Sequence, residues 1–416
     1  MKKRATLLII LLFALLPFSV FPQDNNIFQI VESVPVETTL DKSALPRPLD
    51  VWIEMINGAS KTIDIETFYF ANEKGEVLEG VLSAIKNAAE RGVQVRVIID
   101  KSFAANNENG IEIVEGLKNI TVKRIPFKDI AGGVMHAKYF VVDGEDLFLG
   151  SQNMDWRALK HIHEIGVRIK NKRMAEMFLT VFEMDWNLCD NYDTEKNSDY
   201  KKEHNKIVPA RIINSKKPLK IQTSDYGEVT LYPAFSPAQL LPKGFEKEET
   251  RLLKIIAKAK KKLCIMFYSY SLKGKEKGNL YRKMDDALRS AAKRGVSVKI
   301  IFSNWAIKKD VTPYIQELSA VPGIEIKFSA IPQYSGGYIK YARVDHSKMF
   351  TADNNISWVS TSNWEQGYFT ESRNATLIMK STLVNAKLNE VFDLMWNSPY
   401  VEKVDPEKEY KPVKRN

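Results

Sequence analysis

The chain repeats one pattern of side chains, and this internal duplication limits the folds that it can adopt. The sequence AAERGVQVRVII at residues 88–99 matches AAKRGVSVKIIF at residues 291–302. In both copies a helical pattern stops at a glycine, and a run rich in β-branched residues follows. An alternating, strand-like run precedes each copy and begins at Lys61 in the first half and at Lys262 in the second. We therefore expect one structural unit built twice.

The order strand, helix, strand predicts an α/β fold in which mostly parallel strands carry helices on the faces of the sheet. We expect two repeated α/β sandwich halves packed around a pseudo-twofold axis. A segment rich in Lys, Asn, Asp and Glu separates them and is interpreted as a solvated linker or excursion. The expected organisation is a signal peptide at 1–23, a first half at 24–190, the linker at 191–225, a second half at 226–402 and a charged tail at 403–416.

The N-terminus has the layout of a secretory signal peptide. Basic residues at 2–4 precede an apolar run at 5–20, which Pro17 interrupts, and polar residues begin at Gln23. This pattern predicts export to a periplasmic, extracellular or lumenal compartment. No A-x-A stands before Asp24, so cleavage is left open. The alternative is an uncleaved segment that associates the protein with a membrane.

The formal net charge of +10 favours anionic partners, but it does not choose between nucleic acid and an anionic membrane surface. The two cysteines, Cys189 and Cys264, are compatible with a disulfide in an oxidising compartment and equally with two free thiols. No Cys or His cluster has the spacing of zinc ligands, so we expect neither a metal nor another cofactor.

Two of the five histidines occupy equivalent places in the repeats. The first motif, HAKYFVVD, runs from His136 to Asp143 and is followed by GSQN, which ends at Asn153. The second motif, HSKMFTAD, begins at His346 and is followed by STSN, which ends at Asn363. The interval from His to Asn is 17 residues in both copies, and the copies lie 210 residues apart. An isolated H-x-K is common, but two complete copies in a duplicated chain favour catalysis over a structural role.

Strand geometry explains why these residue types recur at this spacing. A His and a Lys two positions apart on a strand point to the same face, and the apolar residues between them point into the core. A strand returning through the GSQN or STSN segment brings a hydroxyl and an amide to the same pocket. An imidazole, an ammonium group and neutral donors together suit a phosphate, whose oxygens need several donors and a compensating charge.

With these motifs the sequence resembles the phospholipase D superfamily. It is most similar to the animal lysosomal branch of phospholipase D-like 5′ exonucleases and to their poxviral relatives. The segments that carry this closer match are MHAKYFVVD, LFLGSQNMDWRAL, LYPAFSP and TSNWEQGYFTES. The resemblance runs from about Pro46 to Tyr400, interrupted in the linker, and implies two phospholipase D-like halves with one shared active site. The second copy departs from the family pattern because Ser360 and Thr361 replace Gly-Ser, although Thr still supplies a hydroxyl.

The resemblance implies a two-step reaction that needs no metal. One imidazole attacks phosphorus and forms a phosphohistidine, while the other protonates the leaving oxygen and then activates water. Family analogy makes His136 the nucleophile and His346 the acid and base, and the reverse assignment stays open. Non-bridging oxygens would be held by four side chains, with assistance from two hydroxyls: Lys138, Lys348, Asn153 and Asn363, then Ser151 and Thr361.

Four acidic residues have supporting roles in this interpretation. Glu164 and Glu371 resemble the carboxylates that orient the histidines in the family, although they stand at unequal spacings from the motifs. Asp143 and Asp353 complete the motifs, but strand geometry places them far from the histidines, so we expect them to fix loops.

Other residues are weaker candidates. Glu66 ends an alternating run and either faces the cleft or is an ordinary surface residue. Trp156 and Trp364 follow the two Asn residues, where they stack on a base, line an acyl pocket or belong to the core. The histidines without a counterpart in the other repeat are expected to be surface or structural residues: His161, His163 and His204.

The sequence therefore predicts an exported phosphodiesterase, and it favours a nuclease acting on single-stranded nucleic acid. The alternative is a phospholipase D or transphosphatidylase that acts on phospholipids, because only the groups flanking phosphorus differ. A third class, a membrane-associated scaffold without catalysis, is disfavoured by the two complete motifs.

Overall fold

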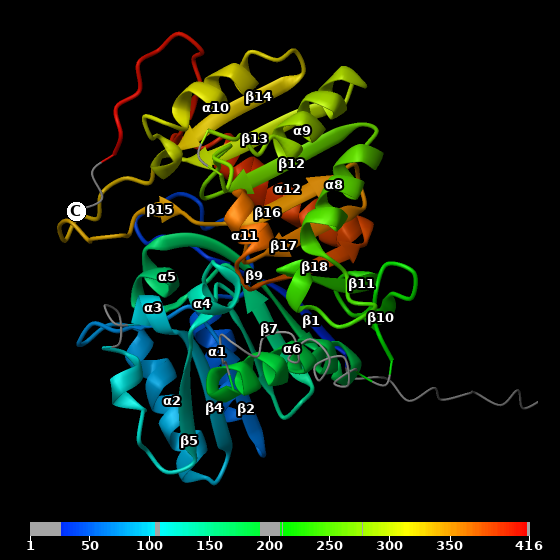
Figure 1. Ribbon diagram of the computed structural model, residues 1–416. Helices are drawn as coiled ribbons and strands as arrows, with labels where there is room; N and C mark the ends of the chain where they lie inside the picture. Colours follow the sequence, from blue (N-terminus) through cyan, green and yellow to red (C-terminus); the bar gives the residue numbers. More distant parts are fainter. Residues whose placement is uncertain (1–25, 105–108, 192–208, 210, 277, 414–416) are drawn as a thin grey trace, which may run out of the picture.

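A computed structural model describes residues 26–104, 109–191, 209, 211–276 and 278–413. Figure 1 shows the two halves stacked on one another, the first coloured blue to green and the second green to red, each around its own sheet. The predicted signal peptide and most of the N-terminal part of the predicted linker lie outside the described residues.

The first sheet mixes parallel and antiparallel strands. Strands β2, β4 and β5 are parallel neighbours, and β1, β9, β7, β6 and β2 pair antiparallel in this order. Strand β15 of the second half joins this sheet by pairing with β9. The order is β1 (Ile27–Ser33), β9 (Ile162–Lys170), β7 (Asp146–Gly150), β6 (Tyr139–Val142), β2 (Thr62–Glu66), β4 (Gln94–Asp100) and β5 (Ile120–Ile125), with β15 (Val344–Asp345) beside β9.

The second sheet repeats this arrangement. The series β9-β7-β6-β2-β4-β5 of the first half corresponds to β18-β17-β16-β12-β13-β14 of the second. The full order is β10 (Leu219–Thr223), β11 (Gly227–Ser236), β18 (Asn374–Lys380), β17 (Ile356–Ser360), β16 (Lys348–Ala352), β12 (Lys262–Phe267), β13 (Ser297–Ser303), β14 (Ile324–Ser329) and β19 (Val401–Lys403). The matched order confirms the predicted α/β fold of two repeated halves.

The expectation of mostly parallel strands was wrong. Only β12–β13 and β13–β14 are parallel in the second sheet, and only β2–β4, β4–β5 and β15–β9 are parallel in the first. Helical crossovers link these strands, whereas each motif strand returns through a tight turn, and such a turn joins antiparallel neighbours. The turns begin at Asp143 and Asp353, which have positive φ angles of 52° and 53°.

Helices cover the sheets and a shared core joins the halves. The longer helices are α1 (Pro48–Asn57), α2 (Leu78–Glu90), α6 (Lys172–Asn191), α8 (Glu248–Lys258), α9 (Lys283–Lys293), α10 (Thr312–Ser319) and α12 (Thr382–Trp396). The short elements are α3 (Lys101–Ala104), α4 (Phe127–Ala131), α5 (Trp156–Lys160), α11 (Gln366–Thr370), η1 (Ile111–Ile113), η2 (Ala238–Leu240), η3 (Asn304–Ala306), β3 (Phe70–Ala71) and β8 (Met154–Asp155).

Each half has an apolar cluster of its own, and a third cluster contains side chains of both halves. Phe178 of α6 packs edge to face on Phe235 of β11, with ring centroids 5.1 Å apart. Leu149 of β7 and Val359 of β17 belong to the same cluster. Such burial of apolar area stabilises the contact between the halves.

Two segments pack more closely than the sequence suggested. Strand β10 lies inside the range interpreted as a linker and pairs with β11 along its whole length. In the tail, Val404 is buried and Tyr410 contacts Phe328 edge to face, with ring centroids 5.2 Å apart. Apolar side chains among the charged ones hold both segments against the second sheet.

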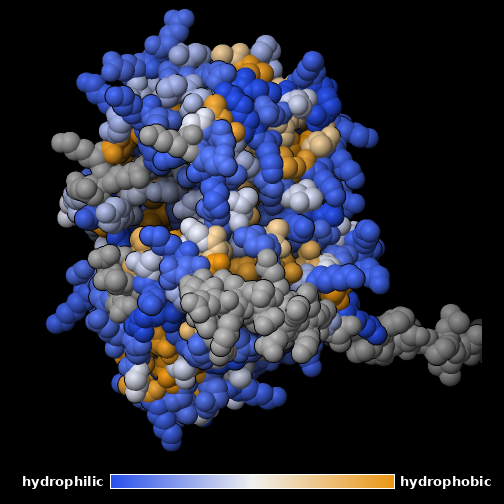
Figure 2. Space-filling model, in the orientation of Figure 1, coloured by the Kyte–Doolittle hydropathy of each residue, from blue (hydrophilic) through white to orange (hydrophobic). Residues whose placement is uncertain are grey.

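The visible face carries mostly hydrophilic residues, and apolar residues appear there only in scattered patches (Figure 2). Within the described ranges, no helix combines the length and apolar character needed to cross a membrane.

Candidate active site

Backbone hydrogen bonds to β9 and to the residue before β18 hold the two motifs at the junction of the halves. The backbone N–H of His136 donates to the carbonyl oxygen of Arg373 at 2.9 Å, and that of His346 donates to the carbonyl oxygen of His163 at 2.9 Å. Each motif is therefore held by a strand of the other half. The result is one buried region that contains the His and Lys residues of both motifs.

The two lysines lie in equivalent surroundings. Lys138 Nζ donates to the carbonyl oxygen of His136 at 2.8 Å, and Lys348 Nζ donates to that of His346 at 2.7 Å. Each ammonium group also lies near an aromatic ring, 5.3 Å from the centroid of Phe68 in the first half and 5.2 Å from that of Tyr268 in the second. This matching geometry follows from the duplication.

The histidines have unequal partners. His346 Nδ1 pairs with the carboxylate of Glu164, which is fully buried. His136 Nδ1 instead lies 3.1 Å from Oδ1 of Asn374. The Asn374 amide nitrogen donates to the carbonyl oxygen of Tyr368 at 2.7 Å, which turns its oxygen toward His136. His136 Nδ1 is therefore the donor, and its Nε2 is left for chemistry at phosphorus.

Glu371 was wrongly expected to orient a histidine. Its carboxylate pairs with Lys275 at 2.7 Å, and Lys275 is largely exposed. The correct position was readable from the repeat, because the offset of 210 residues that relates His136 to His346 also relates Glu164 to Asn374. Because a carboxylate was expected in both halves, the amide of Asn374 was not identified from the sequence.

The remaining predicted ligands line the same buried region. Asn153 and Asn363 are 8% and 2% exposed, and their amide oxygens have no hydrogen-bond partner among the residues that the structure describes. Ser151 Oγ accepts from the N–H of Ile165 at 3.2 Å, and Thr361 Oγ1 donates to Asn374 Oδ1 at 3.0 Å. The two hydroxyls thus hold the strands that carry the orienting residues.

Ser360 replaces glycine without occupying the phosphate pocket. Its hydroxyl donates to the buried carboxylate of Glu248 at 2.6 Å, and Ser362 and Thr376 donate to the same carboxylate. Successive residues of a strand face opposite sides, so Ser360 points away from the side on which Thr361 contacts Asn374.

The pocket has more positive than negative groups. Burial, followed by the charges of Lys138 and Lys348, lowers the pKa of His136 well below its usual value. Burial, both lysines and His136 likewise lower the pKa of His346. Burial lowers the pKa of Lys348 to about 7. Burial also raises the pKa of Glu164, although both lysines oppose this. A phosphate anion would supply the negative charge that the pocket lacks.

Asp143 and Asp353 lie at the other ends of the motif strands. The Asp143 carboxylate accepts hydrogen bonds from the backbone N–H groups of Ser60, Lys61 and Thr62 at 2.7–2.9 Å. Asp353 accepts from Lys260, Lys261 and Lys262 in the same way, at 2.7–3.3 Å. Both carboxylates therefore tie the motif turn to a loop, which precedes β2 in the first half and β12 in the second.

Of the weaker candidates, Glu66 and Trp364 are buried and Trp156 lines a cavity. Glu66 is fully buried and accepts a hydrogen bond from Tyr139, so it does not face the cleft. Trp364 belongs to the core, 4.4 Å from the ring centroid of Phe267, whereas Trp156 lines a cavity.

The other histidines that the structure describes are not surface residues. His161 and His163 are both 1% exposed, and His163 pairs with Glu32 and Asp345 at 3.0 and 3.1 Å. His204 lies outside the described residues.

The two cysteines do not form a disulfide. Cys189 and Cys264 are free, and burial raises the pKa of Cys189 to about 12. Over the described ranges, no group of three or more His, Cys, Asp or Glu side chains could hold a metal ion.

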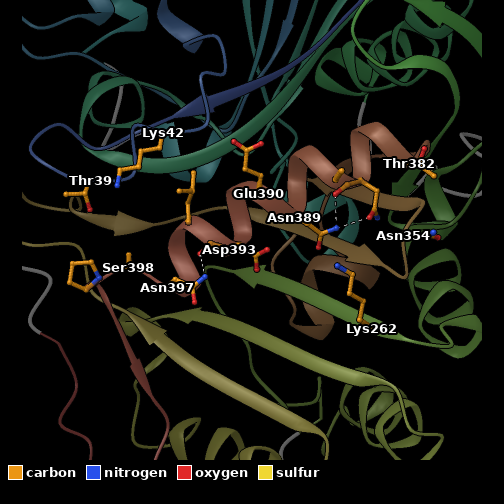
Figure 3. Close-up of a pocket in the computed structure, with 14 residues that line it drawn as sticks. Thr39, Lys42, Lys262, Asn354, Thr382, Asn389, Glu390, Asp393, Asn397 and Ser398 are labelled. Carbon is orange, nitrogen blue, oxygen red and sulfur yellow. Dashed lines mark hydrogen bonds between the residues drawn. The ribbon is translucent and has the colours of Figure 1, made fainter.

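The cavity in Figure 3, of about 860 Å³, is not part of this site. Its polar lining comes mainly from α12, together with Lys262 and Asn354 (Figure 3). Lys262 begins β12, whereas Phe267 at the other end pairs with Lys348. The cavity therefore lies at the opposite ends of the strands from the histidines.

Comparison with known proteins places both halves in one family. The family model described as "Cardiolipin synthase, PLD-like domain" matches residues 52–186 and 252–396. These two ranges contain the first and the second motif, respectively.

Several relatives extend over nearly the whole chain. The virion nicking-joining enzyme of Vaccinia virus (strain Copenhagen) is 30% identical and covers 91% of this chain and 89% of its own length. A probable phospholipase D of Caenorhabditis elegans is 26% identical, with coverage of 89% and 69%. The 5'-3' exonuclease PLD3 of Xenopus laevis is 26% identical, with coverage of 91% and 81%.

A solved structure shows the same fold. The crystal structure of phosphatidylserine synthase from Haemophilus influenzae Rd KW20 superposes with a TM-score of 0.62 at 12% identity, and covers 90% of this chain and 87% of its own.

Proposed function

We propose that this chain, which belongs to the phospholipase D-like family, is an exported nuclease that cleaves single-stranded nucleic acid without a metal ion. Family membership makes it a phosphodiesterase. The observation that carries the mechanism is the joining of two buried His-Lys motifs, each held by a strand of the other half. Lysines and amides around one pocket supply the positive charge and the donors that a metal would otherwise provide.

The unequal partners of the histidines support an assignment of roles. Glu164 stabilises a positive charge on His346, which suits an imidazole that gives and takes protons. Asn374 is neutral and holds only the Nδ1–H of His136, so Nε2 keeps its lone pair for attack on phosphorus. We therefore assign His136 as nucleophile and His346 as acid and base.

The two steps follow from these roles. In the first, a bond forms between His136 Nε2 and phosphorus, the bond to the leaving oxygen breaks, and protonated His346 gives its proton to that oxygen. In the second, His346 takes a proton from water, the hydroxide attacks phosphorus and the P–N bond breaks. Lys138, Lys348 and the two amides hold the non-bridging oxygens in both steps.

Nucleic acid is favoured as substrate by the similarity to a 5'-3' exonuclease and by the net charge of +10. Several exposed large apolar side chains are aromatic, namely Phe103, Tyr338 and Tyr341, and aromatic rings stack on bases. The second candidate, phospholipid cleavage, is supported by the name of the Caenorhabditis elegans relative, a probable phospholipase D.

Export rests on the N-terminal sequence. Its basic residues and apolar run precede a chain whose described ranges hold no membrane-spanning helix. If the segment is retained, it provides the association with a membrane.

The test offers the purified protein three substrates in the presence of EDTA: 5′-labelled single-stranded DNA, double-stranded DNA and phosphatidylcholine vesicles. We expect cleavage of single-stranded DNA at an unchanged rate when EDTA is present, and none of it by His136→Ala. Hydrolysis of phosphatidylcholine alone would establish the second candidate. Loss of all activity in EDTA, restored by Mg²⁺ or Zn²⁺, would refute the mechanism.

A further inference from the structure

A second cavity, of about 650 Å³, lies beside the active site at the junction of the halves. Its wall combines the loop after β3, the start of α5 and the loop that precedes β15. The lining residues are Ala71, Asn72, Glu73, Asn109, Trp156, Arg157, Tyr338, Ile339, Lys340 and Tyr341.

Aromatic side chains connect this cavity to His346. The ring of Tyr268 lies 4.7 Å from the imidazole, Trp305 lies 5.9 Å from Tyr268, and Tyr341 lies 6.3 Å from Trp305, all between centroids. Two rings therefore separate the catalytic imidazole from a tyrosine of the cavity.

A similar path leads from the other histidine. Phe68 lies 5.1 Å from the His136 ring, and Tyr69 lies 5.5 Å from Phe68. The Tyr69 hydroxyl donates at 2.9 Å to Asp155, which is paired with Arg157 of the cavity at 2.6 Å. Chains of side-chain contacts thus link the cavity to both motifs.

The lining offers flat rings and unused polar groups. Tyr338 and Tyr341 are 56% and 46% exposed. Asn72 is only 7% exposed, yet its amide oxygen has no hydrogen-bond partner among the described residues. A buried acceptor of this kind is costly unless a ligand or water satisfies it.

The charges of the cavity do not suit a phosphate. Arg157 is neutralised by Asp155, and the carboxylate of Glu73 opposes the ammonium group of Lys340. The excess positive charge lies instead around the histidines. An uncharged, flat group with hydrogen-bonding edges fits this cavity better than an anion does.

The loop that carries the tyrosines is held in place. Arg157 Nη1 donates to the carbonyl oxygen of Lys340 at 3.0 Å. Arg343 donates to the carbonyl oxygens of Pro332 and Val36 at 2.6 and 2.7 Å. Tyr341 and Arg343 have positive φ angles of 61° and 56°, which cost energy unless the surroundings fix them. The rings are therefore presented in a fixed arrangement.

We propose that this cavity binds a nucleobase of the single-stranded substrate next to the scissile phosphate. Tyr338 stacks on the base beside Tyr341, whose ring already carries Lys340 Nζ at 5.0 Å from its centroid, and Asn72 accepts a hydrogen bond from the edge of the base. The phosphate lies between the histidines while Lys340 faces the sugar-phosphate backbone. This inference rests on the proposed nuclease function and adds where the enzyme holds the strand.

The experiment compares Tyr338→Ala with Tyr338→Phe, which retains the ring, and with Leu383→Ala, an exposed change on α12 outside this cavity. Stacking on an aromatic side chain contributes about 1–3 kcal/mol per base, which corresponds to about 5- to 150-fold in affinity. We expect the KM for a single-stranded oligothymidylate to rise by a factor in this range for Tyr338→Ala only. The kcat/KM for bis(p-nitrophenyl) phosphate, which has no base, should not change.

A second variant tests the edge contact. Asn72→Ala should alter the ratio of kcat/KM values among oligonucleotides of single-base composition, and leave bis(p-nitrophenyl) phosphate cleavage unchanged.

The outcomes separate this inference from the function on which it rests. A wild-type protein that cleaves bis(p-nitrophenyl) phosphate but no oligonucleotide would refute the nuclease function itself. If the wild type cleaves oligonucleotides and neither variant changes KM or base preference, the subsite is refuted alone. Loss of phosphatidylcholine hydrolysis by Tyr338→Ala, with unchanged oligonucleotide kinetics, would instead make the cavity a lipid site and overturn the inference.

Discussion

At the scale of single residues, the duplicated site is symmetric in its lysines and asymmetric in what orients its histidines. Glu164 and Asn374 occupy the same place in the repeat, but only the first is an ionisable group. An anionic partner favours the protonated form of an imidazole, whereas an amide oxygen only fixes the tautomer. The two histidines are therefore expected to differ in function although their motifs match.

This difference predicts how the two alanine variants respond to the leaving group. Removal of His346 as general acid should lower the rate about 10²–10⁴-fold on an ordinary diester. A substrate that releases p-nitrophenolate needs little protonation, so His346→Ala should regain much of its rate for the first step and accumulate phosphohistidine. His136→Ala should regain nothing. The labelled histidine can be mapped after denaturation at neutral or basic pH. A label on His346 would reverse the assignment.

Residue types and spacing placed both histidines and both lysines correctly in one buried region, since each lysine affects the charge of the opposite histidine. Glu371 was misassigned because its chemistry was given more weight than its place in the repeat. The burial of His161 and His163 was not predictable from the sequence, because it depends on strands β1 and β15, which come from distant parts of the chain.

At the scale of elements, the motif aspartates link turns to strands. Although burial opposes it, hydrogen bonds from Thr62, Ser60 and Lys61 lower the pKa of Asp143. The carboxylate sits at the turn between β6 and β7, and it anchors the loop before β2. The motif hairpin and the neighbouring parallel strand are thus fixed at the end opposite to the histidine.

Asp143→Ala should therefore destabilise the fold without affecting the chemistry. Loss of these hydrogen bonds leaves several backbone donors without their partner, at a cost of about 1–3 kcal/mol because water replaces part of the interaction at this exposed loop. Urea unfolding should show the loss, while kcat stays near that of the wild type. Asp143→Asn keeps one acceptor oxygen, so its unfolding free energy should lie between those of the wild type and Asp143→Ala. A large fall in kcat of folded Asp143→Ala would contradict a purely structural role.

The helices and core strands were predictable from local periodicity, but the pairing was not. Strand β10 alternates apolar and polar residues, as Leu219, Ile221 and Thr223 show, yet its lysine and glutamine suggested a solvated linker. The polar residues face water because β10 is an edge strand. Its neighbour β11 pairs in turn with β18, which lies far along the chain, so local sequence could not reveal the sheet.

At the scale of the whole molecule, buried charges join the halves beside the active site. Arg373 pairs with Asp185 of α6 at 2.6 Å, and both side chains are fully buried. The equivalent position in the first half, by the same offset of 210 residues, is His163, which lies between Glu32 and Asp345. One half therefore contributes a permanent cation to the junction and the other a titratable one.

The titratable cation makes the stability of the junction depend on pH. Although burial opposes it, the hydrogen bonds that His163 donates to Asp345 and Glu32 raise its pKa to about 10. An unfolded histidine has a pKa of about 6.5. Because the folded pKa is the higher one, the stabilisation is fully present below about pH 6.5 and is lost as the pH rises through about 10.

His163→Gln should consequently be most destabilising in acid. Removing one partner of a buried ion pair costs about 3–5 kcal/mol, so the difference in unfolding free energy from wild type should be of this size at pH 6 and should shrink steadily toward pH 10. Arg373→Met provides the control, since arginine stays charged and its loss should cost a similar amount at pH 6 and pH 9. Urea unfolding curves measured from pH 6 to pH 10 would give these differences in unfolding free energy. A difference for His163→Gln that does not change with pH would mean that the histidine is neutral and that the junction is held by packing alone.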